Sequence, residues 1–279
     1  MNKKMIFGGL LLAFLSPAVF AQELPVPSPY AEVEQRIGLT DVEIEYSRPG
    51  VKGREVFGKL VSFGKVWRTG ANAPTTIELS TDATLGGKAV KAGTYSIFTI
   101  PGETAWKFML NSDEEAYESS YKAENNVLEI EVTPNEIEKR ESLLFYFDNI
   151  KDESADLILE WDNMQVVVPM TVKADEQAIS NIKEKIAELE ENFRAYNSAA
   201  RYYLDHDKDL EQALAWSMKS VEIDAKFWNV YTLSLIQHKM GKTKEAIKTA
   251  ERSLELAKQD EYEPYIKRNE ANIAEWSKK

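Results

Sequence analysis

VVVPMTVKADEQAISNIKEKI, residues 166–186, contains the point at which the chain changes its hydrophobic period. In its first part the apolar side chains alternate, as at Val166 and Val168, and this is the period of a β-strand. In its second part they recur at three and four residues, as at Ile179 and Ile182, which places them on one face of an amphipathic helix. The stretch therefore predicts a β domain that ends where a helical domain begins.

The alternation extends back through residues 30–172, for example at Ile77 and Leu79 and again at Trp106 and Phe108. Gly, Pro, Asn and Asp interrupt it, and residues 85–88 have the composition of a tight turn. Eight to ten short strands without a helical stretch between them predict an antiparallel β-sandwich of the jelly-roll-like kind. A β-barrel is the alternative.

Downstream of the change, no proline occurs between Pro169 and Pro264, and good helix formers dominate. An internal repeat at an offset of 33 residues pairs, among others, Ala213 with Ala246 and Ser220 with Ser253. A period near 34 with small residues at helix crossings resembles the tetratricopeptide repeat family. Two such units fit into residues 194–258, and we expect the segments 176–191 and 263–276 to cover their ends.

The first 21 residues have the order of a secretory signal peptide. Lys3 and Lys4 precede an apolar run over residues 5–15, and small residues stand before Ala21, after which we expect cleavage. This interpretation assigns residues 1–21 to the signal peptide, 22–173 to the β-sandwich and 174–279 to the helical domain. It places the mature protein in the periplasm or outside the cell.

Composition excludes several classes of function. The chain has no cysteine, so disulfides, dithiol redox chemistry and thiolate zinc sites are excluded. Loss of Lys3 and Lys4 with the leader changes the net charge from −12 to −14, which opposes binding to nucleic acid. Outside the leader no segment approaches about 18 uninterrupted apolar residues, so we expect no membrane span.

A basic segment interrupts this acidic sequence. Residues 48–68 contain six basic residues and one acid, within a glycine-rich connection whose alternation is lost from Val51 to Ala73. Such a segment is typical of a cradle for an anionic or sugar-like ligand, because guanidinium groups donate in pairs and an aromatic ring can stack on a sugar. The candidate ligand-binding residues are Arg48, Lys52, Arg54, Lys65, Trp67, Arg68, Asn72 and Thr75. The alternative is a purely structural ion-pair hub, in which the arginines bind carboxylates such as those of Glu43, Glu45 or Glu160.

The same region resembles a secreted bacterial family catalogued as domain of unknown function 2911. The resemblance is carried by SRPGVKGR at residues 47–54, GKVWRTGAN at 64–72 and GTYSIFTIPG at 93–102. It extends over about residues 27–172 and implies a β-rich fold and an envelope setting. The family has no established activity, so the resemblance implies no reaction.

Signals for catalysis or metal binding are weak. The acidic segment 205–211 lacks the glycine and the final glutamate of a calcium loop, and Asp209 fits better as a helix cap. The two histidines, His206 and His238, both lie in the helical half, and no G-x-G occurs. We therefore expect no metal and no cofactor, and an enzyme is less favoured than a binding protein.

Three interpretations remain open at this point. In the first, a non-enzymatic envelope protein binds a polar or anionic ligand with its β-sandwich and docks another envelope protein or a peptide with its helical repeats. In the second, the β-sandwich is a periplasmic glycan hydrolase that uses paired carboxylates. In the third, it is the structural module described above.

Overall fold

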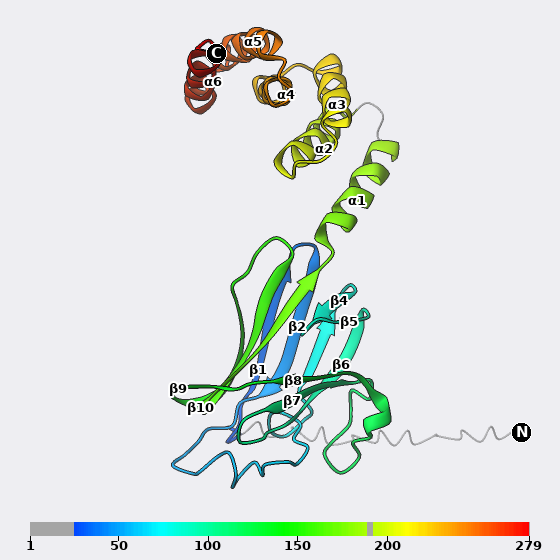
Figure 1. The fold of residues 1–279 in the computed structure, drawn as a ribbon, viewed down its shortest axis with the longest axis vertical. Coiled ribbons are helices and arrows are strands. Elements are labelled where there is room, and N and C mark those ends of the chain that lie inside the picture. The colour runs from blue at the N-terminus through cyan, green and yellow to red at the C-terminus, as the bar shows by residue number, and fades with distance from the viewer. Residues whose placement is uncertain (1–24, 189–191, 279) are drawn as a thin grey trace, which may run out of the picture. The chain divides into compact units, whose positions relative to one another are not determined.

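A computed structural model describes residues 25–188 and 192–278, and within them every β-strand precedes every α-helix (Figure 1). Contacts within the chain divide it into two units. The first contains the residues up to Gln35 together with Asp41–Asn149 and Ala155–Met170. The second contains Arg36–Thr40, Ile150–Ser154 and the residues from Thr171 onward. The predicted signal peptide and its cleavage site lie outside the described residues.

The larger sheet of the first unit has six strands in the order β1-β2-β3-β6-β7-β8. Their bounds are β1 Tyr30–Ile37, β2 Thr40–Ser47, β3 Thr76–Leu79, β6 Gly93–Ile100, β7 Trp106–Asn111 and β8 Asn126–Val132. The alternation of the sequence becomes an alternation of burial, since Ile77 and Leu79 of β3 are buried and Glu78 between them is exposed. One face of the sheet therefore lies in the core.

The smaller sheet has four strands in the order β5-β4-β10-β9. Their bounds are β4 Ala83–Leu85, β5 Lys88–Val90, β9 Asn135–Asp148 and β10 Ser154–Val172. The predicted turn joins β4 to β5, and both its glycines have the positive φ that this turn requires, 54° for Gly86 and 80° for Gly87.

One strand is longer than the prediction of short strands allowed. The sequence shows two apolar runs, around residues 157–161 and 166–172, but both belong to β10. Its pairing with β9 shifts register between Glu160 and Met164, on either side of Asp162, whose φ is 52°. The irregularity breaks the alternation without ending the strand.

Aromatic side chains join the two sheets into a sandwich. Tyr46 of β2 packs edge-on against Phe145 of β9 with ring centroids 5.0 Å apart. The backbone N–H of Phe145 also donates a hydrogen bond to the Tyr46 hydroxyl oxygen over 3.1 Å. Phe57 contacts both Trp106 of β7 and Trp161 of β10. The predicted antiparallel β-sandwich is thus confirmed.

The second half of the chain is helical, as predicted, and its described residues form six α-helices after the last strand (Figure 1). Their bounds are α1 Ala174–Glu188, α2 Phe193–Asp205, α3 Leu210–Ile223, α4 Phe227–Lys239, α5 Thr243–Gln259 and α6 Glu263–Trp276. Asp209 caps α3 as expected, since its carboxylate accepts from the backbone N–H groups of Glu211 and Gln212. The small residues Ala213 and Ala246, which the repeat pairs, are fully buried.

The repeat also appears as a repeated hydrogen-bond pattern. Ser220 of α3 donates its hydroxyl to the carbonyl of Phe193 over 2.6 Å, and its oxygen accepts from the Asn229 amide over 2.9 Å. One unit later, Ser253 of α5 donates to the Phe227 carbonyl over 2.8 Å and accepts from the Asn269 amide over 2.9 Å. Each serine therefore links its own helix to the helices on both sides. We call this pattern the serine–asparagine relay.

Candidate functional site

The predicted site lies on the long connection between β2 and β3, residues 48–75. Short bridges attach this connection to both sheets, one between Gly50 and Ser142 of β9 and one between Trp67 and Thr99 of β6. A third bridge joins Phe57 to Val61 within the connection itself. The segment is therefore held at several points along its length, although it forms no regular strand.

A cavity of about 420 Å³ lies along this connection. Four of the eight predicted residues line it, namely Arg54, Lys65, Trp67 and Arg68. Glu118, from the connection between β7 and β8, and Trp161 of β10 line it as well. The cavity lies within the first unit, and its volume is in the range of small-molecule sites in proteins.

Arg48 and Lys52 do not line the cavity. The Arg48 side chain donates through Nε to the backbone carbonyl of Leu143 over 2.9 Å. Lys52 donates through Nζ to the carbonyl of Pro27 over 3.2 Å. Both cations therefore attach the connection to neighbouring backbone, which is a structural use of their charge.

Asn72 and Thr75 also lie outside the cavity lining. The Asn72 amide donates to the carbonyl of Ser28 over 3.0 Å, and the fully buried Thr75 donates its hydroxyl to the carbonyl of Thr69 over 3.1 Å. The structure thus brings together half of the predicted set and uses the other half to shape the connection.

Trp67 forms part of the core rather than an open platform. It is 7% exposed, its ring stacks on Trp161 with centroids 5.7 Å apart, and the Phe57 ring packs against it edge-on with centroids 6.3 Å apart. Its indole N–H donates to the carbonyl of Gly70 over 3.1 Å. Little of either indole face is accessible, so the geometry does not favour the stacking of a sugar ring on Trp67.

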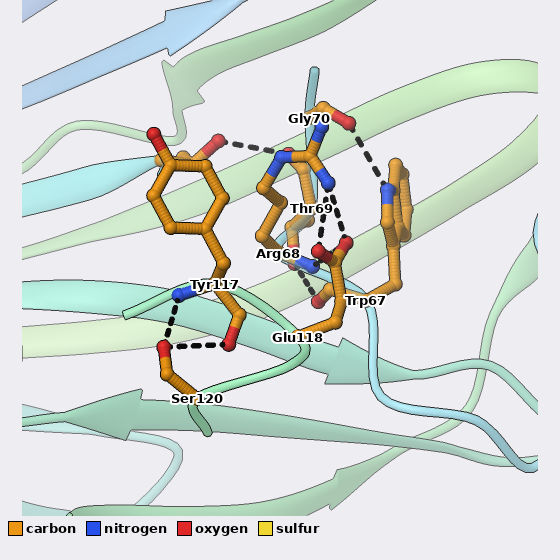
Figure 2. Close-up of polar contacts among 8 residues, drawn as sticks. Trp67, Arg68, Thr69, Gly70, Tyr117, Glu118 and Ser120 are labelled. Atoms are coloured by element: carbon orange, nitrogen blue, oxygen red, sulfur yellow. Dashed lines mark hydrogen bonds and ion pairs between the residues drawn. The ribbon is translucent and has the colours of Figure 1, made fainter. Parts of the chain in front are cut away.

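Arg68 is paired with a carboxylate (Figure 2). Its Nη1 lies 2.7 Å from both carboxylate oxygens of Glu118, and its backbone N–H donates to the same group over 3.2 Å. The guanidinium also lies 5.9 Å from the ring centroid of Tyr117. The Arg68 and Glu118 side chains are 24% and 32% exposed, so the pair is partly desolvated. Their charges cancel at the cavity wall.

Glu118 is a cavity residue that sequence reasoning missed. A tight turn presents it, in which the Ser120 hydroxyl accepts from the backbone N–H of Tyr117 and donates to the Tyr117 carbonyl (Figure 2). The backbone N–H of Ser120 also donates to that carbonyl. Glu118 is separated from Arg68 by 50 positions in an acid-rich stretch. No local pattern distinguishes it there from the neighbouring acids.

Arg54 and Lys65 have no carboxylate partner among residues 25–188 and 192–278. Arg54 donates through Nε to the Val51 carbonyl over 3.0 Å and through Nη2 to the Gly50 carbonyl over 2.5 Å. These bonds engage two of the five N–H donors of the guanidinium. Both acceptors are neutral carbonyls, so they do not neutralise its positive charge. Lys65 is exposed and makes no ion pair in the same described ranges. The cavity therefore carries two uncompensated positive charges.

The carboxylates suggested for the structural ion-pair hub bind elsewhere. Glu160 is 5% exposed and is bound by Arg140, by the Tyr146 hydroxyl over 2.8 Å and by the Gln165 amide over 2.8 Å. Burial raises the pKa of Glu160, but the hydrogen bonds from these three side chains outweigh it and hold the pKa below its ordinary value of 4.5.

This lowered pKa predicts an acid sensitivity of the β9–β10 pair. A carboxyl group whose pKa is lower in the folded state contributes stability above its unfolded pKa, and this contribution is lost as the pH falls through the folded pKa. Hydrogen exchange of β9 and β10 peptides should therefore show falling stability below about pH 4.5. In Glu160→Gln this fall should be smaller. An unchanged pH dependence in Glu160→Gln would contradict the attribution of the acid sensitivity to Glu160.

A cluster of carboxylates lies on the outer strands of the larger sheet. The side chains of Glu32, Glu43 and Glu45 each offer an oxygen, and these atoms lie within 4.8 Å of one another. Partial burial raises the pKa of Glu43, and the neighbouring carboxylates raise it further. The Tyr30 hydroxyl donates to Glu45 over 2.7 Å. Exposed acidic groups of this kind are common without an ion, and we assign no metal to them.

The fold and the site together define a class of two-unit proteins in which a β-sandwich with a cation-lined cavity precedes tetratricopeptide-like helical hairpins. A family model described as Protein of unknown function (DUF2911) matches residues 28–170, and a model described as Tetratricopeptide repeat matches residues 230–260. The chain belongs to the DUF2911 family, and both resemblances seen in the sequence are confirmed. No curated protein and no solved structure gives a significant match.

The tetratricopeptide match indicates interaction with protein partners, because such repeats stack into extended surfaces that bind other chains. Within residues 25–188 and 192–278 none of the helices combines the length and the apolar character of a membrane span.

Proposed function

We propose that the chain is a non-enzymatic binding protein whose β-sandwich holds a small polar or anionic ligand in the cavity and whose helical repeats dock a protein partner. The observation that carries the first part is the pair of uncompensated cations, Arg54 and Lys65, at the wall of that cavity. An acidic chain that keeps unpaired positive charge in a recess stabilises a negatively polarised guest there.

The setting that we propose is the bacterial envelope. It rests on the order of charged, apolar and small residues in positions 1–21 and on membership of the DUF2911 family. The partner docked by the helical unit would then be another envelope protein or a peptide segment of one.

The carboxylate arrangement opposes a glycan hydrolase. Retaining and inverting glycosidases both need two carboxyl groups on either side of the bond that is cleaved. Of the described residues that line the cavity, Glu118 is the single acid, and Arg68 neutralises it. The open cavity also opposes the purely structural interpretation, since a hub that served only stability would be closed.

The ligand part can be tested on the whole mature chain. We expect native mass spectrometry of protein purified from its own envelope to show a bound small molecule. The double variant Arg54→Ala/Lys65→Ala should lose it, because both free charges are removed. Lys59→Ala is the matched control, since Lys59 is an exposed cation of the same connection that does not line the cavity. Equal retention by all three proteins would place the bound molecule elsewhere.

The proposal that the helical repeats dock a partner needs an experiment that shows which unit of the chain the partner contacts. Cross-linking of the mature chain in envelope extract should join partner proteins to lysines of the helical unit, such as Lys226, Lys242 and Lys267. Cross-links confined to lysines of the β-sandwich, such as Lys88 and Lys107, would overturn the assignment of docking to the repeats.

A further inference from the structure

We infer that the cavity takes an amphipathic anion, that is, an oxyanion group such as a phosphate monoester or a carboxylate attached to a small apolar body. This inference rests on the proposed ligand-binding function and names its substrate class. The oxyanion lies against Arg54 and Lys65, and the apolar body lies along the apolar part of the lining, which Pro49, Leu60, Val61 and Val66 form.

The charge balance favours an anion over a neutral polar molecule. Arg54, Lys65 and Arg68 contribute three positive charges to the cavity wall and Glu118 contributes one negative charge. The Arg68–Glu118 pair cancels, so a guest meets the two cations that have no carboxylate partner in the described ranges. An anion beside these cations forms charge-assisted hydrogen bonds that a neutral guest cannot form.

Two N–H groups of residues that line the cavity lack an acceptor within the part of the chain that the structure describes. Among the described residues, Nε of Arg68 and Nε1 of Trp161 are buried without a hydrogen-bond partner, and both residues line the cavity. Both of these atoms are N–H donors. Because neither atom has accessible surface, a guest in the cavity does not contact them, and the choice of an anion rests on the charge balance.

Part of the remaining lining is apolar, beside the hydroxyl groups of Ser28 and Ser62. Pro49, Leu60, Val61 and Val66 line the cavity, and Leu60 keeps 46% of its surface exposed. A volume of about 420 Å³ is larger than a bare phosphate or carboxylate needs, since a cavity of about 150 Å³ already holds benzene. The spare volume and the exposed Leu60 side chain together call for an apolar portion on the guest.

A neutral sugar fits this lining poorly. Recognition of a sugar ring usually needs an accessible aromatic face, whereas Trp67 and Trp161 are 7% and 2% exposed and stack on each other. Glu118 is the single carboxylate among the described lining residues, and Arg68 already engages it, so the side-chain acceptors left for a sugar are the hydroxyls of Ser28 and Ser62. The observations therefore favour an anion over a polyhydroxylated guest.

Glu118 sets how strongly the cavity attracts an anion. In Glu118→Gln the side chain keeps a carbonyl oxygen for Arg68 but loses its negative charge, so a third cation becomes uncompensated. A unit charge at a few ångströms changes affinity by about tenfold or more at a partly buried site. An anionic guest should therefore bind tighter to this variant, whereas a sugar that used the carboxylate as an acceptor should bind more weakly.

The experiment measures binding of four probes to the mature full-length chain by calorimetry at low ionic strength. The probes are phenyl phosphate, phenylacetate, inorganic phosphate and the neutral phenyl β-glucoside. We expect phenyl phosphate or phenylacetate to bind at least tenfold tighter than the glucoside. Glu118→Gln should strengthen that binding about tenfold, and Arg54→Ala or Lys65→Ala should weaken it by about the same factor. Lys59→Ala should change it by less than twofold.

A separate variant tests whether the guest has an apolar portion. Leu60→Ser should weaken phenyl phosphate several-fold and leave inorganic phosphate unchanged, because only the former has an apolar body to bury. Preference for phenyl phosphate over phenylacetate identifies a phosphoryl group as the oxyanion, and the reverse preference identifies a carboxylate. Inorganic phosphate that binds as tightly as phenyl phosphate would overturn the amphipathic part of the inference.

Failure of this inference can be distinguished from failure of the proposed function. If the glucoside binds, the anions do not, and Arg54→Ala/Lys65→Ala abolishes the binding, the cavity is a ligand site for neutral guests and only the inference is overturned. If no probe binds and no molecule remains bound to the purified wild-type chain, both are overturned. Tighter binding of the anions to wild type than to Glu118→Gln would also overturn the inference.

Discussion

Replacing Trp106 with alanine should lower the free energy of unfolding of the β-sandwich by about 3–5 kcal/mol. The side chain is 1% exposed and lies at the start of β7, the strand next to the edge strand β8 of the larger sheet. Its ring centroid is 4.8 Å from that of Phe57, which also contacts Trp161 of the opposite sheet. Alanine would leave a large cavity where these contacts join the two sheets.

Hydrogen exchange of Trp106→Ala measures this loss of stability, and the helical unit of the same molecule serves as the reference. Peptides from β7 and β8 should lose protection in Trp106→Ala, while peptides from α5 should keep theirs. Trp106→Phe should cost much less, because the Trp106 indole N–H has no hydrogen-bond partner in the described structure and phenylalanine keeps most of the apolar volume. A phenylalanine variant as unstable as the alanine variant would show that the cost does not come from lost volume.

The second large effect is expected at Asn229. Asn229→Ala should destabilise the helical unit by about 1–3 kcal/mol, the usual cost of leaving buried hydrogen-bonding groups unpaired. The side chain is fully buried, donates to Ser220 and to the Asp224 carbonyl, and accepts from the backbone N–H of Lys226. Its removal breaks the serine–asparagine relay at the junction of α3 and α4.

The loss of stability in Asn229→Ala should appear as a lower midpoint of thermal unfolding, monitored by circular dichroism at the helical band. Asn272→Ala is the matched control on α6, because the Asn272 amide is half-buried and makes a single longer bond of 3.3 Å to the Tyr231 hydroxyl. Asn229→Asp keeps the acceptor for Lys226 and loses the amide donor, so it should be intermediate in stability. Equal midpoints for Asn229→Ala and Asn272→Ala would contradict the importance of the relay.

Much of the fold could be predicted because it depends on local periods. The change from period two to period 3.6 within residues 166–186 corresponds to the end of β10 at Val172 and the start of α1 at Ala174. The 33-residue offset that pairs Ser220 with Ser253 corresponds to two equivalent positions in the relay. Asn229 and Asn269 were not found in this way, because they are 40 positions apart and so depart from the repeat.

The candidate site was predictable only in part, for a physical reason. Charge and glycine content identified the connection that lines the cavity, but not which of its cations line it. Arg48 and Arg54 have the same side chain and both donate to backbone carbonyls, yet only Arg54 lines the cavity. That difference is set by tertiary contacts, as is the pairing of Arg68 with the distant Glu118.

The bridges that tie the connection to both sheets have a consequence for energetics of association. The connection that forms much of the cavity wall is anchored to β9 through Gly50 and to β6 through Trp67, so its backbone is already held in place before any guest arrives. Little conformational entropy then remains to be lost on complex formation, and a larger share of the contact energy is retained as affinity. A guest of modest size can therefore be held firmly, and affinity differences among related guests should arise mainly from how fast each one leaves.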